Sequence, residues 1–468
     1  MAKLYIFGIG GTGARVLRSL TMLLASGVQL SQDEVVPILI DPDESNADLS
    51  RTVDLMNSYS KIRKNLTFAS SNNNKFFRTN IVQELPNFRL QIRDTDDKSF
   101  QKFMDVTTMS RENQALVKLL FSEKNLKSKM DVGFKGNPNI GSVVLNQIAN
   151  SDDFEDFANG FSSGDKIFII SSIFGGTGAS GFPLLLKTLR TGKSFSNFQV
   201  INNAEIGAIT ILPYFKLETS EESEIDSSTF ITKTKSALAY YEDNISKNGQ
   251  INALYYLGDD GIQNTYENHE GGVDQRNSAH LIEFLAATAI VDFSNGEFPT
   301  TVNKEFGIKE DVNTVSFTFF GDEVNNMVRC PLTQFVLMSN CFKHIWSTIS
   351  TKNLAANGKV SEFNEDFFRS PFMSDIKNFQ ENFLDWLKEL KANKRSLDLF
   401  NLDCGDKPFD VVTNVPPRKV KSLKSNYSLF IDRINGQVGK LGSKDAKDKL
   451  LEMYYLATKQ LAKEKFGF

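Results

Sequence analysis

Residues 174–181 read FGGTGASG, and they separate two apolar runs, KIFIISSI (166–173) and FPLLLKTLR (182–190). The first run is typical of a buried strand and the second of a helix. Glycines allow the backbone to approach a ligand closely, and the free N–H groups at a helix start attract negative charge. The segment therefore predicts either a phosphate site or a tight strand-to-helix turn that needs glycine for its backbone angles alone.

A second glycine turn lies at the start of the chain, where KLYIF (3–7) runs into GIGGTG (8–13) and a helical pattern follows. The apolar run VVPILID (35–41) predicts the next strand, and EIGAITILPYF (205–215) and NALYYLG (252–258) predict later ones. Alternating strands and helices indicate an α/β protein with a parallel sheet. GIGGTG also fits the dinucleotide fingerprint GxGxxG, so an NAD-dependent enzyme that uses Asp41 on the ribose is an alternative.

The composition sets limits on the function. The 468 residues are 24% charged with a net charge of -4, which favours neither nucleic acid nor an anionic membrane surface as a partner. The three cysteines lack metal-binding or disulfide spacing, and the three histidines are far apart in the sequence. There is no secretory signal pattern and no apolar run of the ~20 residues that cross a bilayer, so we expect a cytoplasmic protein.

The pattern of elements predicts four parts. They are a nucleotide-binding domain over 1–276 with an insertion at about 52–130, a long apolar helix over 277–297, a second domain over 298–440, and a terminal helix over 441–468. In the second domain, PFDVVTNV (408–415) and NYSLFIDRI (426–434) are predicted as strands. The insertion and the terminal helix are candidate surfaces for a protein partner.

Five motifs, in sequence order, resemble those of the tubulin/FtsZ superfamily of GTP-dependent filament formers. They are GIGGTGARV (8–16), DPDESNADL (41–49), GNPNIG (136–141), FGGTGASGFP (174–183) and FPTTVNKEF (298–306). The resemblance covers roughly residues 1–50 and 130–325. It implies a Rossmann-like parallel-sheet GTPase domain, a long central helix and an α+β second domain.

The same resemblance implies GTP or GDP as ligand, together with Mg²⁺. Asp41 and Asp43 would order water around the metal, or else cap the turn after their strand. Glu218 would contact the ribose, or lie in a solvated acidic loop; Asn277 would read guanine, or cap the long helix. The predicted nucleotide contacts are Gly8, Gly10, Gly11, Thr12, Gly13, Asp41, Asp43, Gly136, Asn137, Pro138, Gly141, Gly175, Gly176, Thr177, Gly178, Ala179, Ser180, Glu218 and Asn277.

Hydrolysis of GTP requires a water held in line with the terminal phosphate. In the superfamily, the loop that positions this water comes from the next subunit, and Asn303 and Glu305 are at the matching positions. The second acid of FtsZ is replaced by Ile308 here, and Glu305 could instead be an exposed loop carboxylate. The resemblance thus predicts self-assembly head to tail, with a non-polymerising nucleotide switch or adaptor, for example in phage defence, as the alternative.

Overall fold

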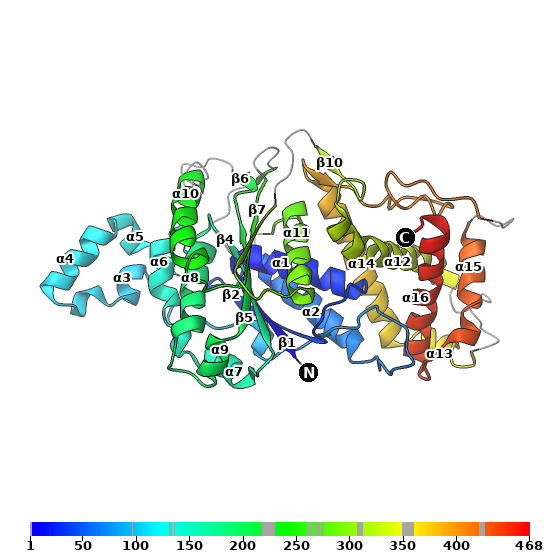
Figure 1. Cartoon of the computed structure of the whole chain (residues 1–468), viewed down its shortest axis with the longest axis horizontal. Helices are drawn as coiled ribbons and strands as arrows, with labels where there is room; N and C mark the ends of the chain where they lie inside the picture. Colours follow the sequence, from blue (N-terminus) through cyan, green and yellow to red (C-terminus); the bar gives the residue numbers. More distant parts are fainter. Residues whose placement is uncertain are drawn as a thin grey trace.

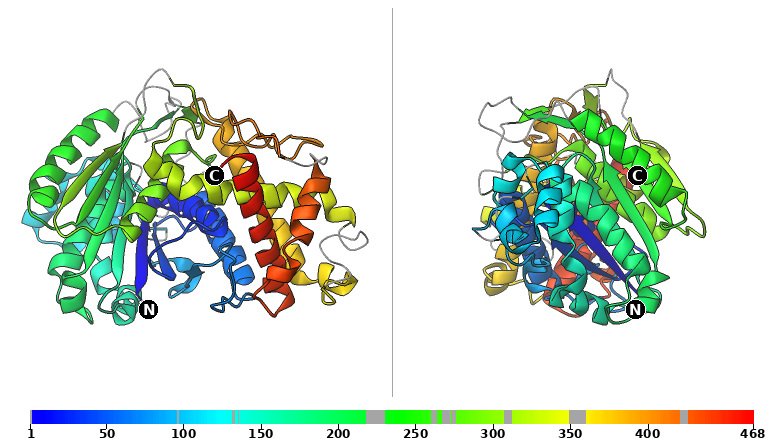
Figure 2. Two further views of the ribbon diagram at one scale, coloured as in Figure 1. Left: turned by 45° about the vertical axis from the view of Figure 1, so that its right-hand side comes forward. Right: turned by 90° about the vertical axis from the view of Figure 1, so that its left-hand side faces the viewer.

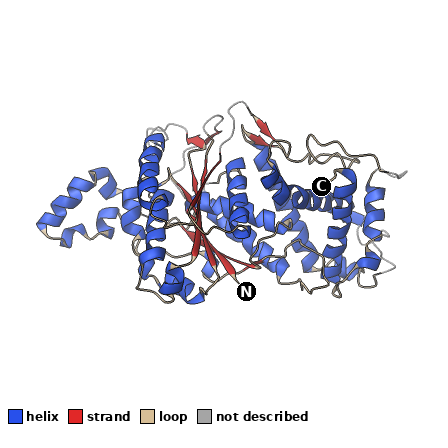
Figure 3. Cartoon of the chain, viewed as in Figure 1, coloured by secondary structure: helices blue, strands red, loops and turns tan. Residues whose placement is uncertain are grey.

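A parallel sheet of seven strands forms the centre of the protein in the computed structural model (Figures 1 and 3). The structure describes residues 2–95, 97–130, 133–134, 136–217, 230–259, 264–266, 272, 276–306, 312–348, 360–420 and 426–468. The strand order is β3-β2-β1-β4-β5-β7-β9. The strands are β1 (Lys3–Ile9), β2 (Glu34–Ile40), β3 (Asn80–Ile81), β4 (Lys166–Ser172), β5 (Glu205–Ile211), β7 (Ala253–Leu257) and β9 (Val302–Phe306).

The central strands are almost continuously apolar because helices cover both faces of the sheet (Figure 1). One face carries α1 (Gly10–Ala25), α2 (Ala47–Arg63) and α11 (Leu281–Asn295). The other carries α6 (Pro138–Leu145), α7 (Asp152–Gly160), α8 (Gly176–Thr191), α9 (Phe198–Asn202) and α10 (Phe230–Tyr241). The predicted α/β class and parallel sheet are confirmed.

The direction of the strand order reverses between β1 and β4. The polypeptide leaves β1 into α1 on one face of the sheet and leaves β4 into α8 on the other face (Figure 1). Two helices that diverge from neighbouring parallel strands leave a crevice at the carboxyl ends of those strands, which is the usual ligand site of such sheets. The sheet topology thus brings the two glycine segments to one place.

The second half of the protein is mainly helical and packs beside α1, α2 and α11 (Figure 2). Its helices are α12 (Asp322–Ile345), α13 (Glu365–Phe368), α14 (Pro371–Ala392), α15 (Tyr427–Asn435) and α16 (Ala446–Lys465). Two short parallel pairs complete the described sheets, β10 (Thr314–Val315) with β11 (Ser396–Leu397), and β6 (Phe215–Leu217) with β8 (Asn264–Tyr266).

Two of the predicted strands are wrong. Residues 427–434 lie in α15, with Asn426 as its N-cap, because their apolar residues also fit a helical period and pack against α16. Residues 408–415 form turns, with a single isolated bridge between Phe400 and Val412.

Some boundaries differ from those predicted. The helix α2 continues to Arg63 and β3 joins the main sheet, so the first part of the predicted insertion belongs to the domain predicted to bind nucleotide. Only the later part projects from the protein, as an arm of α3 (Phe100–Phe103), α4 (Arg111–Leu120) and α5 (Glu123–Lys127) (Figure 1). The segment 302–306, expected in a second domain, is the edge strand of the main sheet. The long apolar helix starts at Leu281 rather than at residue 277.

The arm exposes apolar side chains, and the described helices do not span a membrane. Leu116, Leu119 and Leu120 on the arm are 51%, 83% and 61% exposed, which is unusual for adjacent leucines on one helix. Within the described ranges, every helix is too short or too polar to cross a lipid bilayer.

Candidate functional site

Three helices start at the carboxyl ends of β1 and β4. The first helical residues are Gly10 in α1, Gly176 in α8 and Pro138 in α6. A Cβ atom on Gly10 would lie 3.6 Å from the Cβ of Thr177, and one on Gly176 would lie 3.1 Å from the backbone nitrogen of Asn137. The structure thus brings together the segments 8–13, 136–138 and 175–177, which are the centre of the predicted phosphate site.

The amide groups at these three helix starts have no partner within their own helices. At none of the three N-cap residues (Ile9, Asn137 and Gly175) does a side chain accept a capping hydrogen bond, and none of the three helices has an acidic residue in its first turn. In contrast, α2, α7 and α11 have both a capping group and an acid there. Three uncapped positive dipole ends at one place form a site suited to a polyanion.

Some of the glycines predicted to contact the nucleotide allow a helix to pack closely against its strand. A Cβ on Gly13 would lie 2.5 Å from the carbonyl carbon of Gly8, and one on Gly178 would lie 2.5 Å from the carbonyl oxygen of Ser172. Glycine at these positions allows each helix to start directly against its strand. Of the glycines in 8–13 and 175–181, only Gly10 has a left-handed backbone, with φ of 73°.

Two more of the predicted residues, Gly141 of α6 and Ser180 of α8, lie where these helices contact each other. A Cβ on Gly141 would overlap the Ser180 hydroxyl. That hydroxyl donates within α8, with the O of Gly176 at 2.7 Å and the O of Thr177 at 3.2 Å. Ser180 therefore packs the two helices together, while Gly11, Thr12 and Ala179 lie in the first turns of α1 and α8.

The Asp43 carboxylate caps the turn after β2, which is the alternative predicted for it. Its Oδ1 accepts hydrogen bonds from the N and the Oγ of Ser45, and its Oδ2 accepts one from the N of Gly272 at 2.6 Å. With both oxygens committed, the carboxylate holds the turn after β2 to residue 272. The described residues contain no cluster of three or more metal-binding side chains.

Asp41 accepts a hydrogen bond from the N of Asp43 at 3.0 Å and lines a polar cleft of about 290 Å³ beside Arg89. Burial, with the neighbouring Asp43 charge, raises the pKa of Asp41 to about 7, although the Asp43 amide and Arg89 act in the opposite direction. Asp41 therefore lies in a polar cleft directly after the carboxyl end of β2.

Asn277 does not cap the long helix. The N-cap of α11 is His280, whose Nδ1 accepts from the N of Ile282 at 3.1 Å, while Glu283 accepts from the N of His280 at 3.0 Å. The carboxamide nitrogen of Asn277 instead donates to Asp48 at 3.0 Å. This bond fixes Asn277 close to α1 and α2.

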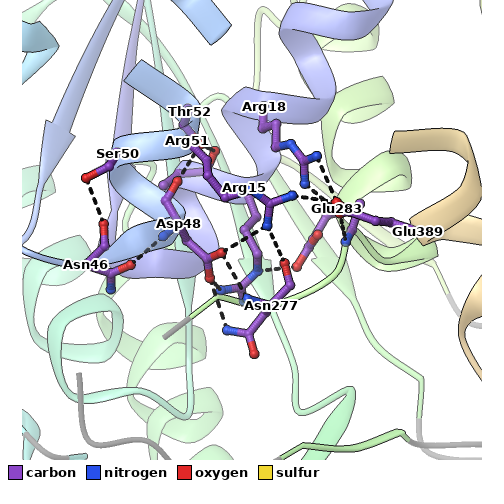
Figure 4. Close-up of polar contacts among 12 residues, drawn as sticks. Arg15, Arg18, Asn46, Asp48, Ser50, Arg51, Thr52, Asn277, Glu283 and Glu389 are labelled. Atoms are coloured by element: carbon purple, nitrogen blue, oxygen red, sulfur yellow. Dashed lines mark hydrogen bonds and ion pairs between the residues drawn. The ribbon is translucent and has the colours of Figure 1, made fainter. Parts of the chain in front are cut away.

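A buried ionic network lies behind the first turn of α1 (Figure 4). Arg15 donates to Asp48 at 2.7 Å, to Glu283 at 2.5 Å and to the hydroxyl of Tyr214 at 2.9 Å, and all these side chains are buried. Burial and the Arg15 charge act in opposite directions on Tyr214, and its pKa is raised well above the usual range. The network fixes the start of α1 to α2 and α11.

The sequence interpretation did not include this network. A signal was present, because Arg15 and Arg18 stand in an otherwise apolar helix, where each buried cation requires an acid. Arg18 is paired with Glu389 of α14 at 2.7 Å, and Arg51 of α2 contacts the same carboxylate. Glu389 thereby joins the second half of the protein to the first (Figure 4).

Residues 303 and 305 do not lie among the phosphate segments. Asn303 is exposed and accepts a hydrogen bond from the hydroxyl of Ser246 at 3.4 Å, and Glu305 pairs through its backbone in register with Tyr256. The strand β9 is separated from β4 by β5 and β7, which corresponds to about 14 Å at the usual strand spacing. The side chain of Glu305 and the whole of Glu218 lie outside the described residues.

One basic side chain at the site was also missed. Lys233 of α10 donates from Nζ to the O of Gly136 at 2.8 Å. It lies more than 50 positions from either neighbouring glycine segment, so no local motif indicates it.

No family model and no curated protein matches the sequence. Solved structures that it matches include CetZ and TubZ proteins. CetZ from Methanosaeta thermophila strain DSM 6194 is 17% identical, with a TM-score of 0.26, over 55% of this chain and 46% of that one. CetZ2 from Haloferax volcanii, in a GTPγS-bound protofilament, is 14% identical, with a TM-score of 0.30, over 62% and 57%.

A third match is the GTPγS-form protofilament of Bacillus thuringiensis serovar israelensis TubZ, which is 10% identical, with a TM-score of 0.25, over 55% of this chain and 48% of that one. The protein thus spans about half the length of the solved structures it matches. Likenesses of this extent give no residue a role.

Proposed function

We propose that the protein binds GTP through its phosphates at the three converging helix starts, hydrolyses it, and assembles head to tail. The observation that carries the proposal is the uncapped state of α1, α6 and α8 where they meet. A triphosphate supplies the negative charge that these amide groups and helix dipoles would stabilise. The site lies where the strand order reverses, as expected for a nucleotide-binding sheet.

The choice of guanine rests on the sequence resemblance and on the position of Asn277. This residue lies near the start of α1, where the bond to Asp48 holds its side chain. A carboxamide can both donate to and accept from a base edge. In the proposal, Asn277 contacts the base while Asp48 orients it.

Hydrolysis in the proposal depends on a second copy of the protein. Because β9 is an edge strand about 14 Å from β4, Asn303 and Glu305 are too far away to act on phosphates bound by the same copy. Because β9 is at the edge of the sheet, its residues could contact a neighbouring copy of the protein. Residues 303 and 305 would then position the attacking water in trans, and repetition of this contact without closure would give a filament.

Two measurements test the proposal. Titration of the purified protein with GTP, ATP and NAD should show binding of GTP in preference to the other two. The GTP hydrolysis rate per molecule should rise with protein concentration, and Glu305→Ala should reduce this rise without weakening GTP binding. As a control, Glu381→Ala changes an exposed acid on α14, away from β9, and should leave both measurements unaltered.

Each result that contradicts the proposal has a distinct meaning. Binding of NAD in place of GTP would favour the dinucleotide alternative for GIGGTG. A rate per molecule that stays constant with concentration, with no sedimenting assemblies in GTP or GTPγS, would favour a non-polymerising switch. In that second case, the arm with its exposed leucines would be the first surface to test for a protein partner.

A further inference from the structure

The arm of α3, α4 and α5 has an apolar stripe with basic surroundings. Leu116, Leu119 and Leu120 lie three and four positions apart on α4, so they share one side of the helix, and each is more than half exposed. Residues 98–130, which contain the arm, have seven lysines or arginines and three acids, whereas the whole chain has a net charge of -4. Such an exposed apolar stripe is typical of a surface that binds another protein.

An apolar groove lies on the other face of the main sheet, between β7, α11 and α12. Its volume is about 40 Å³, and its apolar lining includes Leu257, Leu285 and Met327. That volume holds about three water-sized groups, which is close to the size of one leucine side chain. Glu323 also lines the groove, and it is exposed, as is its neighbour Asp322 at the start of α12. The groove thus has apolar walls and an acidic edge.

We propose that the arm of one copy of the protein binds the groove of the next copy, with a leucine of α4 between the groove walls. The two surfaces are complementary, since both are apolar and their charges are opposite. The arm lies beyond α6 and α8, whereas the groove lies on the side of α11 and α12, so one molecule cannot fill its own groove (Figure 1). A contact between two different surfaces repeats from copy to copy, and it gives a filament when it does not close into a ring.

The same contact explains how β9 would reach a second copy, and to that extent the inference rests on the proposed function. The arm ends at Lys127, nine positions before Gly136 in the phosphate segment. The groove borders β9, because Asp292 in its lining forms an ion pair with Lys304 at 2.5 Å. An arm in the groove of the next copy would therefore bring the phosphate site of one copy towards β9 of the other.

The test reverses the charges of the two surfaces. Lys118→Glu with Lys124→Glu changes two exposed lysines of the arm, and Glu323→Lys changes the edge of the groove. The lowest concentration that gives sedimenting assemblies is measured on the full-length protein, with and without GTPγS. Each variant alone should need a concentration on the order of 10-fold higher, because like charges then meet at every contact. An equimolar mixture should assemble near the original concentration, because alternating copies again pair opposite charges.

Two further variants complete the design. Leu119→Ser should also raise the concentration needed, but mixing it with Glu323→Lys should not restore assembly, since the lost contact is apolar. The control, Lys444→Glu with Lys459→Glu, changes two exposed lysines beside and on α16 and should assemble like the original protein. Urea midpoints establish that each variant is folded before assembly is compared.

Other results would overturn the inference. If the arm variant assembles at the original concentration, or if the mixture assembles no better than either variant alone, the arm does not bind the groove. If the original protein binds GTP in calorimetry but does not self-associate, the arm contact is refuted while nucleotide binding stands. If it binds no GTP but self-associates, and only the mixture restores the association lost in each variant, the proposed function fails while the arm contact stands.

Discussion

Replacement of Arg15 by methionine tests the buried network behind the first turn of α1. Methionine fills much of the same space but leaves Asp48 and Glu283 without their shared cation. Loss of one partner from a buried ion pair costs about 3–5 kcal/mol. Glu283 retains bonds from Tyr214 and His280, so we expect a loss near the lower limit, about 3 kcal/mol.

The assay is urea unfolding followed by circular dichroism, at a fixed pH of 7. Arg369→Met is the matched control, because Arg369, which follows the last residue of α13, forms an exposed ion pair with Glu365 at the start of that helix. Loss of this ion pair should lower the free energy of unfolding by less than about 0.5 kcal/mol. In the double variant Arg15→Met, Glu283→Gln, one of the two unpaired charges is removed, so its loss should be smaller than the sum of the single losses. A loss below about 1 kcal/mol for Arg15→Met alone would refute this account of the network.

Three further predictions concern single positions. Gly178→Ala should lower the free energy of unfolding by about 1–3 kcal/mol, because the new methyl group overlaps the carbonyl of Ser172, whereas Gly439→Ala, which has open space, should have little effect; urea midpoints compare the two. The pKa of Asp41 is raised in the folded protein, so the unfolded protein binds fewer protons between about pH 4 and pH 7 and the free energy of unfolding should fall as pH rises through that window. Asp41→Asn should flatten this pH dependence in urea titrations at several pH values. An unchanged pH dependence in the variant would contradict the prediction. Leu119→Ser should leave the free energy of unfolding within about 0.5 kcal/mol of the original protein and should reduce any self-association detected by light scattering; a large loss of stability would mean that the leucine is covered.

The sheet was accessible from the sequence because its central strands are buried on both faces and read as continuous apolar runs. The edge strand β9 has the sequence VNKEF, which alternates little and contains a lysine and a glutamate, so its strand pairing was not evident. Residues 426–434 contain apolar residues that satisfy two periodicities, and packing against α16 decides for the helix. Local patterns cannot distinguish such cases.

The candidate site was predictable where glycines mark it and unpredictable where distant residues complete it. The glycine segments at residues 8–13 and 174–181 stand out because each lies between a strand pattern and a helix pattern. Arg15 and Glu283 are 268 positions apart, and Lys233 lies 97 positions from Gly136, so only the fold brings them together. For Asp43 the sequence leaves metal binding and turn capping as alternatives, because its bonds to Ser45 and Gly272 are not visible in the sequence.

Glu389 has a consequence for any attempt to divide the protein. Its carboxylate accepts hydrogen bonds from Arg18, from Arg51 and from the backbone nitrogen of Ala279, which belong to three separate parts of the first half. A fragment that stops after β9 would keep both guanidinium groups but lose their common acid, and the apolar sides of α1 and α11 would lose their cover. The two halves should therefore be expressed and engineered together, although the last strand of the main sheet is β9.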